Sequence, residues 1–197
     1  MSTRATRRET SSSYRNGVNL SEDAMTKRAV VYWLVPAKAE RTLLQAFIRI
    51  LAKQRDAPRF EPHLTVFEPR TERRPPKQVL KLIKSGPITL AVNGVGFSSP
   101  FAKTLFVRLQ SNGLLKNLVR DMQSATESRG TTRFEPHLSL LYQRMSAAGK
   151  KELAAAIKLP FRKIVFDSMK AVRCASPTKT AAHVKGWKVL ATKKLIR

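Results

Sequence analysis

The sequence predicts a single α+β domain made of two similar lobes that share a central cleft. A seven-residue phrase occurs twice, as RFEPHLT at residues 59–65 and as RFEPHLS at residues 133–139. Each copy follows an amphipathic helix pattern that is itself preceded by a strand pattern, and each is followed by a second helix and further strands. A chain of 197 residues, 42% of them hydrophobic, is long enough for one such domain.

The first 28 residues are rich in Arg, Ser and Thr and carry almost no apolar clusters, so we expect a disordered basic tail. The domain, residues 29–197, should begin with the apolar strand 29–35, which Pro36 ends. Residues 39–54 predict a helix because apolar side chains recur at helical spacing. That stripe consists of Leu43, Leu44, Phe47, Ile48 and Leu51.

The first copy of the phrase continues into Val66-Phe67 and predicts a short buried strand. A basic loop with Pro75-Pro76 then leads to a short helix at 77–84. The same two periodicities predict strands at 88–97 and 104–110, a helix at 112–128 before the second copy, a helix at 147–157, and strands at 162–174 and 186–195.

Both copies of the phrase place polar groups on one face of a strand. Because side chains alternate between faces, His63 and Thr65 point the same way, as do His137 and Ser139. The intervening leucines point to the opposite face. Two strands therefore each present an imidazole beside a hydroxyl on an apolar support.

The net charge of +25 lies mainly in the folded part, because residues 1–28 account for only +3 of it. One basic cluster spans residues 70–84, directly after the first histidine strand, and we expect it near one rim of the cleft. A second cluster spans residues 162–197. The charge indicates either general solubility or a polyanionic partner such as RNA, and charge alone leaves both open.

Composition excludes several classes of protein. No apolar run approaches the ~20 residues of a membrane span, so we expect a soluble, cytoplasmic monomer without membrane contact. The single cysteine, Cys174, rules out an intramolecular disulfide and any multi-cysteine metal site, and its strand-like context favours a core position. The sequence offers no metal-ligand set, and we expect no cofactor.

Paired His-x-Thr and His-x-Ser strands in a basic chain of this size resemble the two-histidine (2H) phosphoesterase superfamily. The run Pro-His-Leu-Ser-Leu-Leu-Tyr at 136–142 is most similar to its cyclic phosphodiesterase branch, and the resemblance covers residues 29–197. It implies a bilobal fold, with an antiparallel sheet and outer helices in each lobe around a central cleft. It also implies that His63, Thr65, His137 and Ser139 are catalytic, with His63 as the acid and His137 as the base.

This chemistry needs those residue types. Opening a cyclic phosphodiester requires a base for the attacking water and an acid for the departing ribose oxygen. Two histidines with ordinary pKa values near ~6.5 supply both at neutral pH without a metal. Thr65 and Ser139 are placed to donate hydrogen bonds to the phosphoryl oxygens as these gain charge.

Other residues are candidates for binding or packing. The resemblance suggests aromatic groups that stack on the nucleobase: Trp33 and Tyr142 occupy matching positions, although either could be a core residue. Phe101 is a candidate to close over the substrate. We expect Phe60 and Phe134 to pack the lobes, and His183 to be an ordinary residue of a polar loop at 178–185. We expect Glu61 and Glu135 to turn away from the phosphate and to pair with Arg59 and Arg133.

The sequence thus predicts a metal-independent hydrolase that converts 2′,3′-cyclic phosphates to 2′-phosphates. Its substrate would be a cyclic nucleotide, an ADP-ribose cyclic phosphate or an RNA end. One alternative is an RNA 2′,5′-ligase or RNA-end-processing enzyme of the same superfamily. Another is a non-catalytic RNA-binding module on the same fold, against which the intact histidines and hydroxyls of both motifs count.

Overall fold

This computed structural model describes residues 27–130 and 135–196. The expected tail lies almost entirely outside these residues, and the first strand already begins at Arg28. The elements in chain order are β1 (Arg28–Pro36), α2 (Lys38–Arg55), β2 (Leu64–Phe67), α3 (Pro76–Leu82), β3 (Ile88–Phe97), the 3₁₀ turn η1 (Phe101–Lys103), β4 (Leu105–Leu109), α4 (Gly113–Thr126), β5 (His137–Leu141), α5 (Ala147–Ala156), β6 (Lys163–Ala175), α6 (Ala181–Lys185) and β7 (Lys188–Lys194).

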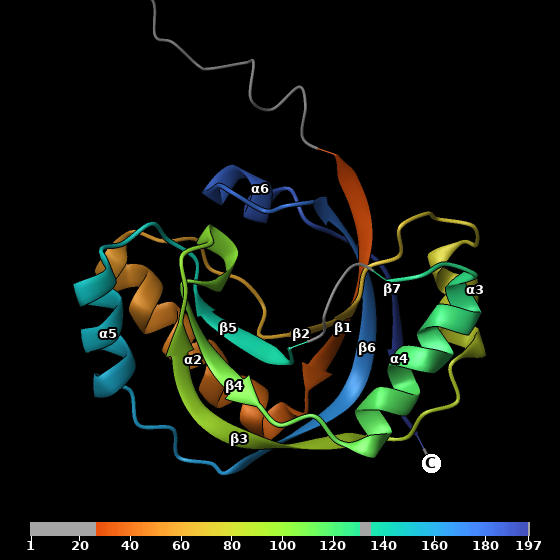
Figure 1. The fold of residues 1–197 in the computed structure, drawn as a ribbon, viewed down its shortest axis with the longest axis horizontal. Helices are drawn as coiled ribbons and strands as arrows, with labels where there is room; N and C mark the ends of the chain where they lie inside the picture. Colours follow the sequence, from red (N-terminus) through yellow and green to blue (C-terminus); the bar gives the residue numbers. More distant parts are fainter. Residues whose placement is uncertain (1–26, 131–134, 197) are drawn as a thin grey trace, which may run out of the picture.

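The elements agree closely with those predicted from periodicity, and two differences have local causes. The histidine strands are short because Pro62 and Pro136 have no N–H to give to a ladder, so regular pairing starts just after them. The expected polar loop at 178–185 contains the helix α6 (Figure 1). Thr180 begins that helix, since its hydroxyl accepts a hydrogen bond from the backbone N–H of His183.

The seven strands form one antiparallel sheet in the order β2-β1-β6-β3-β4-β5. The strand β7 lies outside this order and pairs with residues 168–173 of β6, beyond the part of β6 that pairs with β3. As the sequence predicts, each half has its own antiparallel strands, and β3 takes part in both halves and joins them. Its residues Ile88–Ala91 pair with β6, and Val92–Phe97 pair with β4. A bulge inside the second segment, between Val92 and Val95, contains Gly94 at φ 74°, a conformation that favours glycine. Bulges bend the strand that carries them, and this one lies close to the point where one half becomes the other.

The bent sheet brings its two end strands together. β2 and β5 stand at opposite ends of the strand order, yet they contact each other in the middle of the molecule (Figure 1). The duplicated phrase therefore sits on the two edge strands of one sheet, and the bend makes them neighbours.

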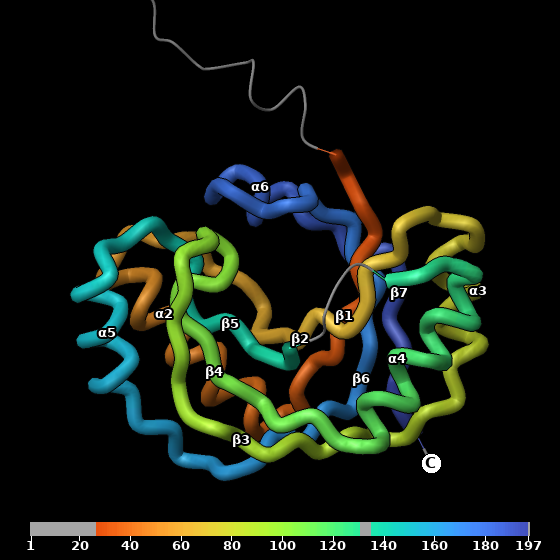
Figure 2. Tube along the Cα trace, in the orientation of Figure 1, coloured from red at the N-terminus to blue at the C-terminus, as the bar shows by residue number. Residues whose placement is uncertain are grey.

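The helices cover the outside of the sheet in an exchanged arrangement. Helix α2 follows β1 in the chain but packs against β5, and α4 follows β4 but packs against β2 (Figure 2). Helix α5 lies beside α2 on one side of the molecule, and α3 lies beside α4 on the other. Each half of the sheet is thus covered by a helix from the other sequence repeat.

The apolar core lies between the sheet and these helices. Fully buried side chains come from every layer, among them Tyr32, Leu44, Leu64, Leu115 and Phe166. Phe60 belongs to this core, which agrees with its predicted packing function, while Phe134 lies outside the described residues. Within residues 27–130 and 135–196, none of the helices combines the length and apolarity needed to cross a membrane.

Candidate active site

Both histidines of the duplicated phrase line one cleft of about 290 Å³. His63 stands immediately before β2 and His137 is the first residue of β5, so the contact between these strands brings the imidazoles to the same place. Thr65 and Ser139 also line the cleft. The alternation predicted from the sequence therefore places all four polar groups as expected.

The two imidazoles are held in the same way. The Nδ1 atom of His63 lies 2.7 Å from the carbonyl oxygen of Glu61, and that of His137 lies 2.9 Å from the carbonyl oxygen of Glu135. A carbonyl only accepts hydrogen bonds, so Nδ1 carries the proton in each neutral ring. Nε2 is then the atom left to exchange protons, as a base when the ring is neutral and as an acid when it is charged.

The histidines differ in burial. His63 is 5% exposed, and burial lowers its pKa to about 4, opposed by the hydrogen bond to Glu61 and assisted by the positive charges of His137 and Lys170. Burial also lowers the pKa of His137, which is only partly buried. Burial thus favours the neutral form of both rings, and the more deeply buried His63 is the harder one to protonate.

The two hydroxyls are engaged differently. The hydroxyl of Ser139 donates to the carbonyl oxygen of Ala102 over 3.0 Å, and must rotate before it can donate to a ligand. The hydroxyl of Thr65 has no hydrogen-bond partner among the described residues. Thr65 is therefore the donor that is ready in the substrate-free state.

Aromatic side chains form one wall of the cleft. Trp33 stacks on His63 with ring centroids 3.7 Å apart, and Tyr142 stacks on Phe60 with ring centroids 4.0 Å apart. Trp33 and Tyr142 both line the cleft but are only 3% and 4% exposed. Each thus has one face covered, and Trp33 supports the imidazole directly. Tyr142 reaches the cleft because it lies just beyond the end of β5.

Phe101 does not line the cleft; it packs beside Tyr142 with ring centroids 6.1 Å apart. Its neighbours in η1, Ala102 and Lys103, line the cleft instead. Lys103 lies 3.6 Å from the carboxylate of Glu135. From the sequence, Phe101 was chosen in this segment for its aromatic ring, and Lys103 was not identified as a cleft residue.

Trp187 is a second cleft residue that sequence reasoning missed. Its ring meets those of Trp33 and His63 edge to face, with centroids 5.1 Å and 5.6 Å away. Its indole N–H is buried without a hydrogen-bond partner within the described part of the chain. A signal was present, because Trp187 is one of only two tryptophans and stands in a polar segment.

Glu61 turns away from the cleft as expected, but its partner is not Arg59. Its carboxylate lies 2.6 Å from the Lys170 ammonium and 3.9 Å from the Arg41 guanidinium. Lys170 is the closer partner because β6 pairs with β1, and Lys170 lies opposite Trp33 in that pairing. This position brings Lys170 close to His63 and Glu61. Arg133, the expected partner of Glu135, lies outside the described residues, and Lys103 pairs with Glu135 instead.

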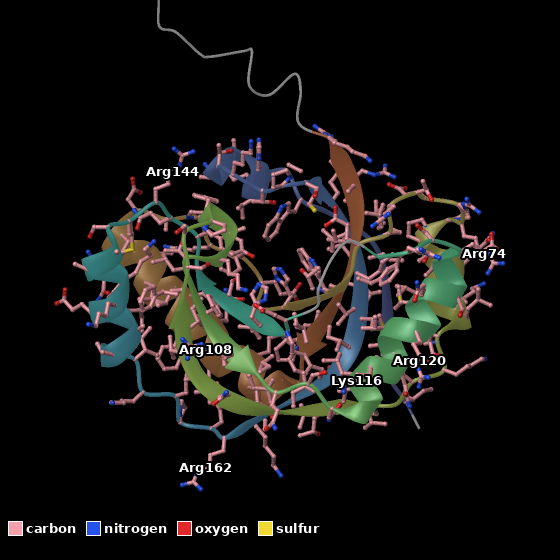
Figure 3. The ribbon with its side chains drawn as sticks, viewed as in Figure 1. Arg74, Arg108, Lys116, Arg120, Arg144 and Arg162 are labelled. Carbon is pink, nitrogen blue, oxygen red and sulfur yellow. The ribbon has the colours of Figure 1, made fainter. Side chains whose placement is uncertain are left out.

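The basic cluster at residues 70–84 is not at the cleft, contrary to the expectation from the sequence. None of its residues is among those that line the cleft. Arg74 lies on the outer side of the molecule beyond α4 and forms an ion pair with Glu127 (Figure 3). Glu68, directly after β2, still lines the cleft, but the residues of the basic cluster that follow do not, so adjacency in sequence does not carry their charge to the rim.

The remaining candidates occupy supporting positions. Cys174 is buried at the cleft wall, and burial raises the pKa of its thiol to about 12, so it is not activated as a nucleophile. His183 lies in α6, outside the cleft, where its Nδ1 accepts a hydrogen bond from the backbone N–H of Lys179. Among the described residues, no group of three or more His, Cys, Asp or Glu is arranged to hold a metal ion.

Comparison with known proteins agrees with this geometry. The model of the family described as "cyclic phosphodiesterase-like protein" matches residues 28–196. No curated protein matches the sequence.

Solved structures share the fold at low identity. LigT of Escherichia coli complexed with 3′-AMP is 13% identical, with a TM-score of 0.53 over 86% of this chain and 99% of LigT. The complex of LigT with NADP⁺ is 15% identical, with a TM-score of 0.51 over 86% and 98% of the two chains. TT0787 of Thermus thermophilus is 18% identical, with a TM-score of 0.53 over 85% and 97%.

Proposed function

The chain belongs to the cyclic phosphodiesterase-like family, and so to the two-histidine phosphoesterases, and on this premise we propose that it hydrolyses 2′,3′-cyclic phosphates to 2′-phosphates without a metal ion. One observation carries the proposal: His63 and His137 share one cleft, each with Nδ1 bound to a backbone carbonyl and a hydroxyl residue two positions further on.

The reaction needs one proton removed and one delivered. The neutral histidine accepts a proton at Nε2 from a water molecule as its oxygen attacks phosphorus. The bond between phosphorus and the 3′ oxygen breaks, and the charged histidine donates its Nε2 proton to that oxygen. The product carries a 2′-phosphate and a 3′-hydroxyl, and exchange of one proton with solvent restores both rings.

The charge that develops on the phosphoryl oxygens needs hydrogen-bond donors. Thr65 supplies its hydroxyl, and Ser139 supplies a second one after rotating away from Ala102. Lys103 adds a positive charge on the same side of the cleft as His137. Removal of a single such donor costs about 10²–10³ in turnover in well-studied enzymes.

The difference in burial supports one choice of acid and base. His63 is the more deeply buried and holds a proton less readily, so it acts as the neutral base. His137 is partly exposed, beside the carboxylate of Glu135, and acts as the acid. This polarity is the reverse of the one that the family resemblance implies.

Nucleotides are the substrates that the fold relatives support. LigT has been crystallised with 3′-AMP and with NADP⁺, and both are nucleotides that carry phosphate. In this chain the ribose and base would lie along the wall formed by Trp33, Tyr142 and Trp187. The buried N–H of Trp187 is a donor that a nucleotide oxygen or ring nitrogen could satisfy.

The test is turnover of 2′,3′-cyclic AMP by single and double histidine variants. His63→Ala and His137→Ala should each lower turnover by about 10²–10⁴-fold, and the double variant should be little worse, because the two groups act as a unit. Arg162→Ala is the control, since this exposed side chain is not among those that line the cleft. Near-wild-type turnover by either cleft variant would contradict the proposal, and would favour a binding module instead.

A further inference from the structure

A second cavity of about 220 Å³ adjoins the catalytic cleft. The two share one wall, because Cys174 and Ala175 line both of them. The cavity lies beside α6, which contributes Ala182 and His183, and at the start of β7. Figure 2 shows that α6 approaches the beginning of β1, the end of β6 and the beginning of β7 at this place.

Three cationic side chains line this cavity, namely Arg28, Arg173 and Lys188. The sheet fixes their positions, since Arg28 lies opposite Ala175 and Arg173 lies opposite Lys188 in the ladders of β1, β6 and β7. The cations are thus presented by adjacent strands of a rigid sheet, at the edge that borders the cleft.

The cavity is electropositive. No acidic residue lines it, and the one carboxylate that reaches a lining cation is that of Glu72, which lies 3.7 Å from the Arg173 guanidinium. Both side chains of that pair are well exposed, at 46% for Arg173 and 41% for Glu72, so water screens the attraction. Arg28 and Lys188 form no ion pair with a described acid.

Size and charge together select the ligand. The cavity, at about 220 Å³, is smaller than the 290 Å³ cleft, and its three cations without an acid suit a charged group rather than an apolar base. Guanidinium and ammonium groups form strong, charge-assisted hydrogen bonds with phosphate oxygens. We propose that the cavity is a phosphate subsite that binds a second phosphate of the substrate while the cyclic phosphate occupies the catalytic cleft.

This inference rests on the proposed function for what fills the cleft, but phosphate binding in the subsite does not require turnover. The second phosphate would be the phosphodiester that precedes an RNA 3′ end or the pyrophosphate of an ADP-ribose cyclic phosphate. A cyclic mononucleotide has no such group. The subsite therefore makes the enzyme prefer substrates that extend beyond one nucleotide.

The experiment compares two variants that each remove two positive charges. The subsite variant combines Arg28→Gln with Lys188→Gln and so removes two of the three cationic side chains that line the cavity. Lys116→Gln with Arg162→Gln is the matched control, because these residues are exposed and lie on the side of the molecule away from α6 (Figure 3). The substrates are 2′,3′-cyclic AMP, the dinucleotide ApA with a 2′,3′-cyclic phosphate end, and ADP-ribose 1″,2″-cyclic phosphate.

The subsite variant should lose about tenfold in kcat/KM on a substrate with a second phosphate, and less than about twofold on 2′,3′-cyclic AMP. For the dinucleotide, the slope of log affinity against log salt should fall by about 0.7 for one lost phosphate contact. Loss on the dinucleotide alone identifies an RNA strand as the occupant, and loss on the ADP-ribose compound alone identifies a pyrophosphate. Equal losses on all three substrates, or the same losses in the control variant, would overturn the proposal.

A binding measurement separates this inference from the proposed function. Calorimetric titration of the wild type and both variants with the linear dinucleotide ApAp and with 3′-AMP needs no catalysis. Tighter binding of ApAp that only the subsite variant loses would support the subsite even if no cyclic phosphate were hydrolysed. Equal affinity of the wild type for the two ligands at low salt would refute it.

Discussion

The burial of His63 should make the protein sensitive to acid in a way that a single substitution removes. The folded-state pKa is about 4, against about 6.5 for an unfolded histidine. The folded protein therefore binds fewer protons at this site than the unfolded chain does. Stability from this residue is complete above the unfolded pKa and is lost as the pH falls from about 6.5 toward 4.

The magnitude follows from the size of the pKa difference. At about 1.4 kcal/mol per pKa unit, full protonation of His63 costs the folded state roughly 3 kcal/mol. Between pH 7 and pH 4.5, linkage assigns about 2 kcal/mol of the loss in the free energy of unfolding to this side chain. His63→Asn keeps a side-chain N–H for the carbonyl of Glu61 and does not titrate, so it should lack this loss.

The measurement is urea denaturation of the wild type and of His63→Asn at both pH values. Groups other than His137, whose charge is coupled to that of His63, titrate equally in the two proteins, so the difference between the two pH-dependent losses isolates His63 and this coupling. Proton NMR offers a second measurement, because the chain has only three histidines whose ring signals can be assigned by substitution. Equal losses of stability in the two proteins, together with an NMR pKa near 6.5 for His63, would refute the burial argument and with it the choice of His63 as the base.

Three further predictions concern the chemistry of the cleft. Replacing the 3′ bridging oxygen of the substrate by sulfur gives a thiolate leaving group, which departs without needing a proton. His137→Ala should therefore regain turnover on this substrate, and His63→Ala should not. The opposite pattern would make His63 the acid. Treatment with EDTA should leave turnover unchanged, with a bell-shaped pH profile, and activity restored only by a divalent ion would show a different mechanism. Because burial raises the pKa of Cys174 to about 12, iodoacetamide should react slowly with the native protein at pH 7.5, and Cys174→Ala should keep turnover within about twofold; rapid alkylation with loss of activity would contradict the assignment.

The sequence was sufficient to predict the elements and the shared face of the polar residues in each copy of the phrase. Alternation in the duplicated phrase depends only on local geometry, so the common face of His63 and Thr65 follows once the segment is extended. The helices α2 and α4 could also be predicted from the sequence, because their apolar residues recur with a helical period. These are the features that short-range rules determine.

Features that depend on which strands become neighbours could not be predicted. Lys170 reaches the site from β6, and nothing near it in the sequence indicates that β6 pairs with β1. Trp187, just before β7, was marked only by its rarity and its polar surroundings, which do not tell that it meets His63. The prediction that the basic cluster at residues 70–84 lies at the rim of the cleft was wrong for the same reason. The chain runs to the outer side of the molecule, where Arg74 pairs with Glu127. The repeat was sufficient to predict an antiparallel sheet in each half, but that β3 runs from one half into the other becomes evident only from its two ladders.

The exchanged helices have a consequence for how the chain folds. Each half of the sheet takes strands from both sequence repeats and is covered by a helix from the other repeat, so neither repeat can bury its apolar surface alone. Productive folding must wait until β1 meets β6 near the opposite end of the chain, and topologies dominated by such distant pairings fold slowly. The duplicated sequence is therefore one cooperative unit rather than two autonomous ones, and a ribosome must deliver nearly the whole chain before either histidine is held in place.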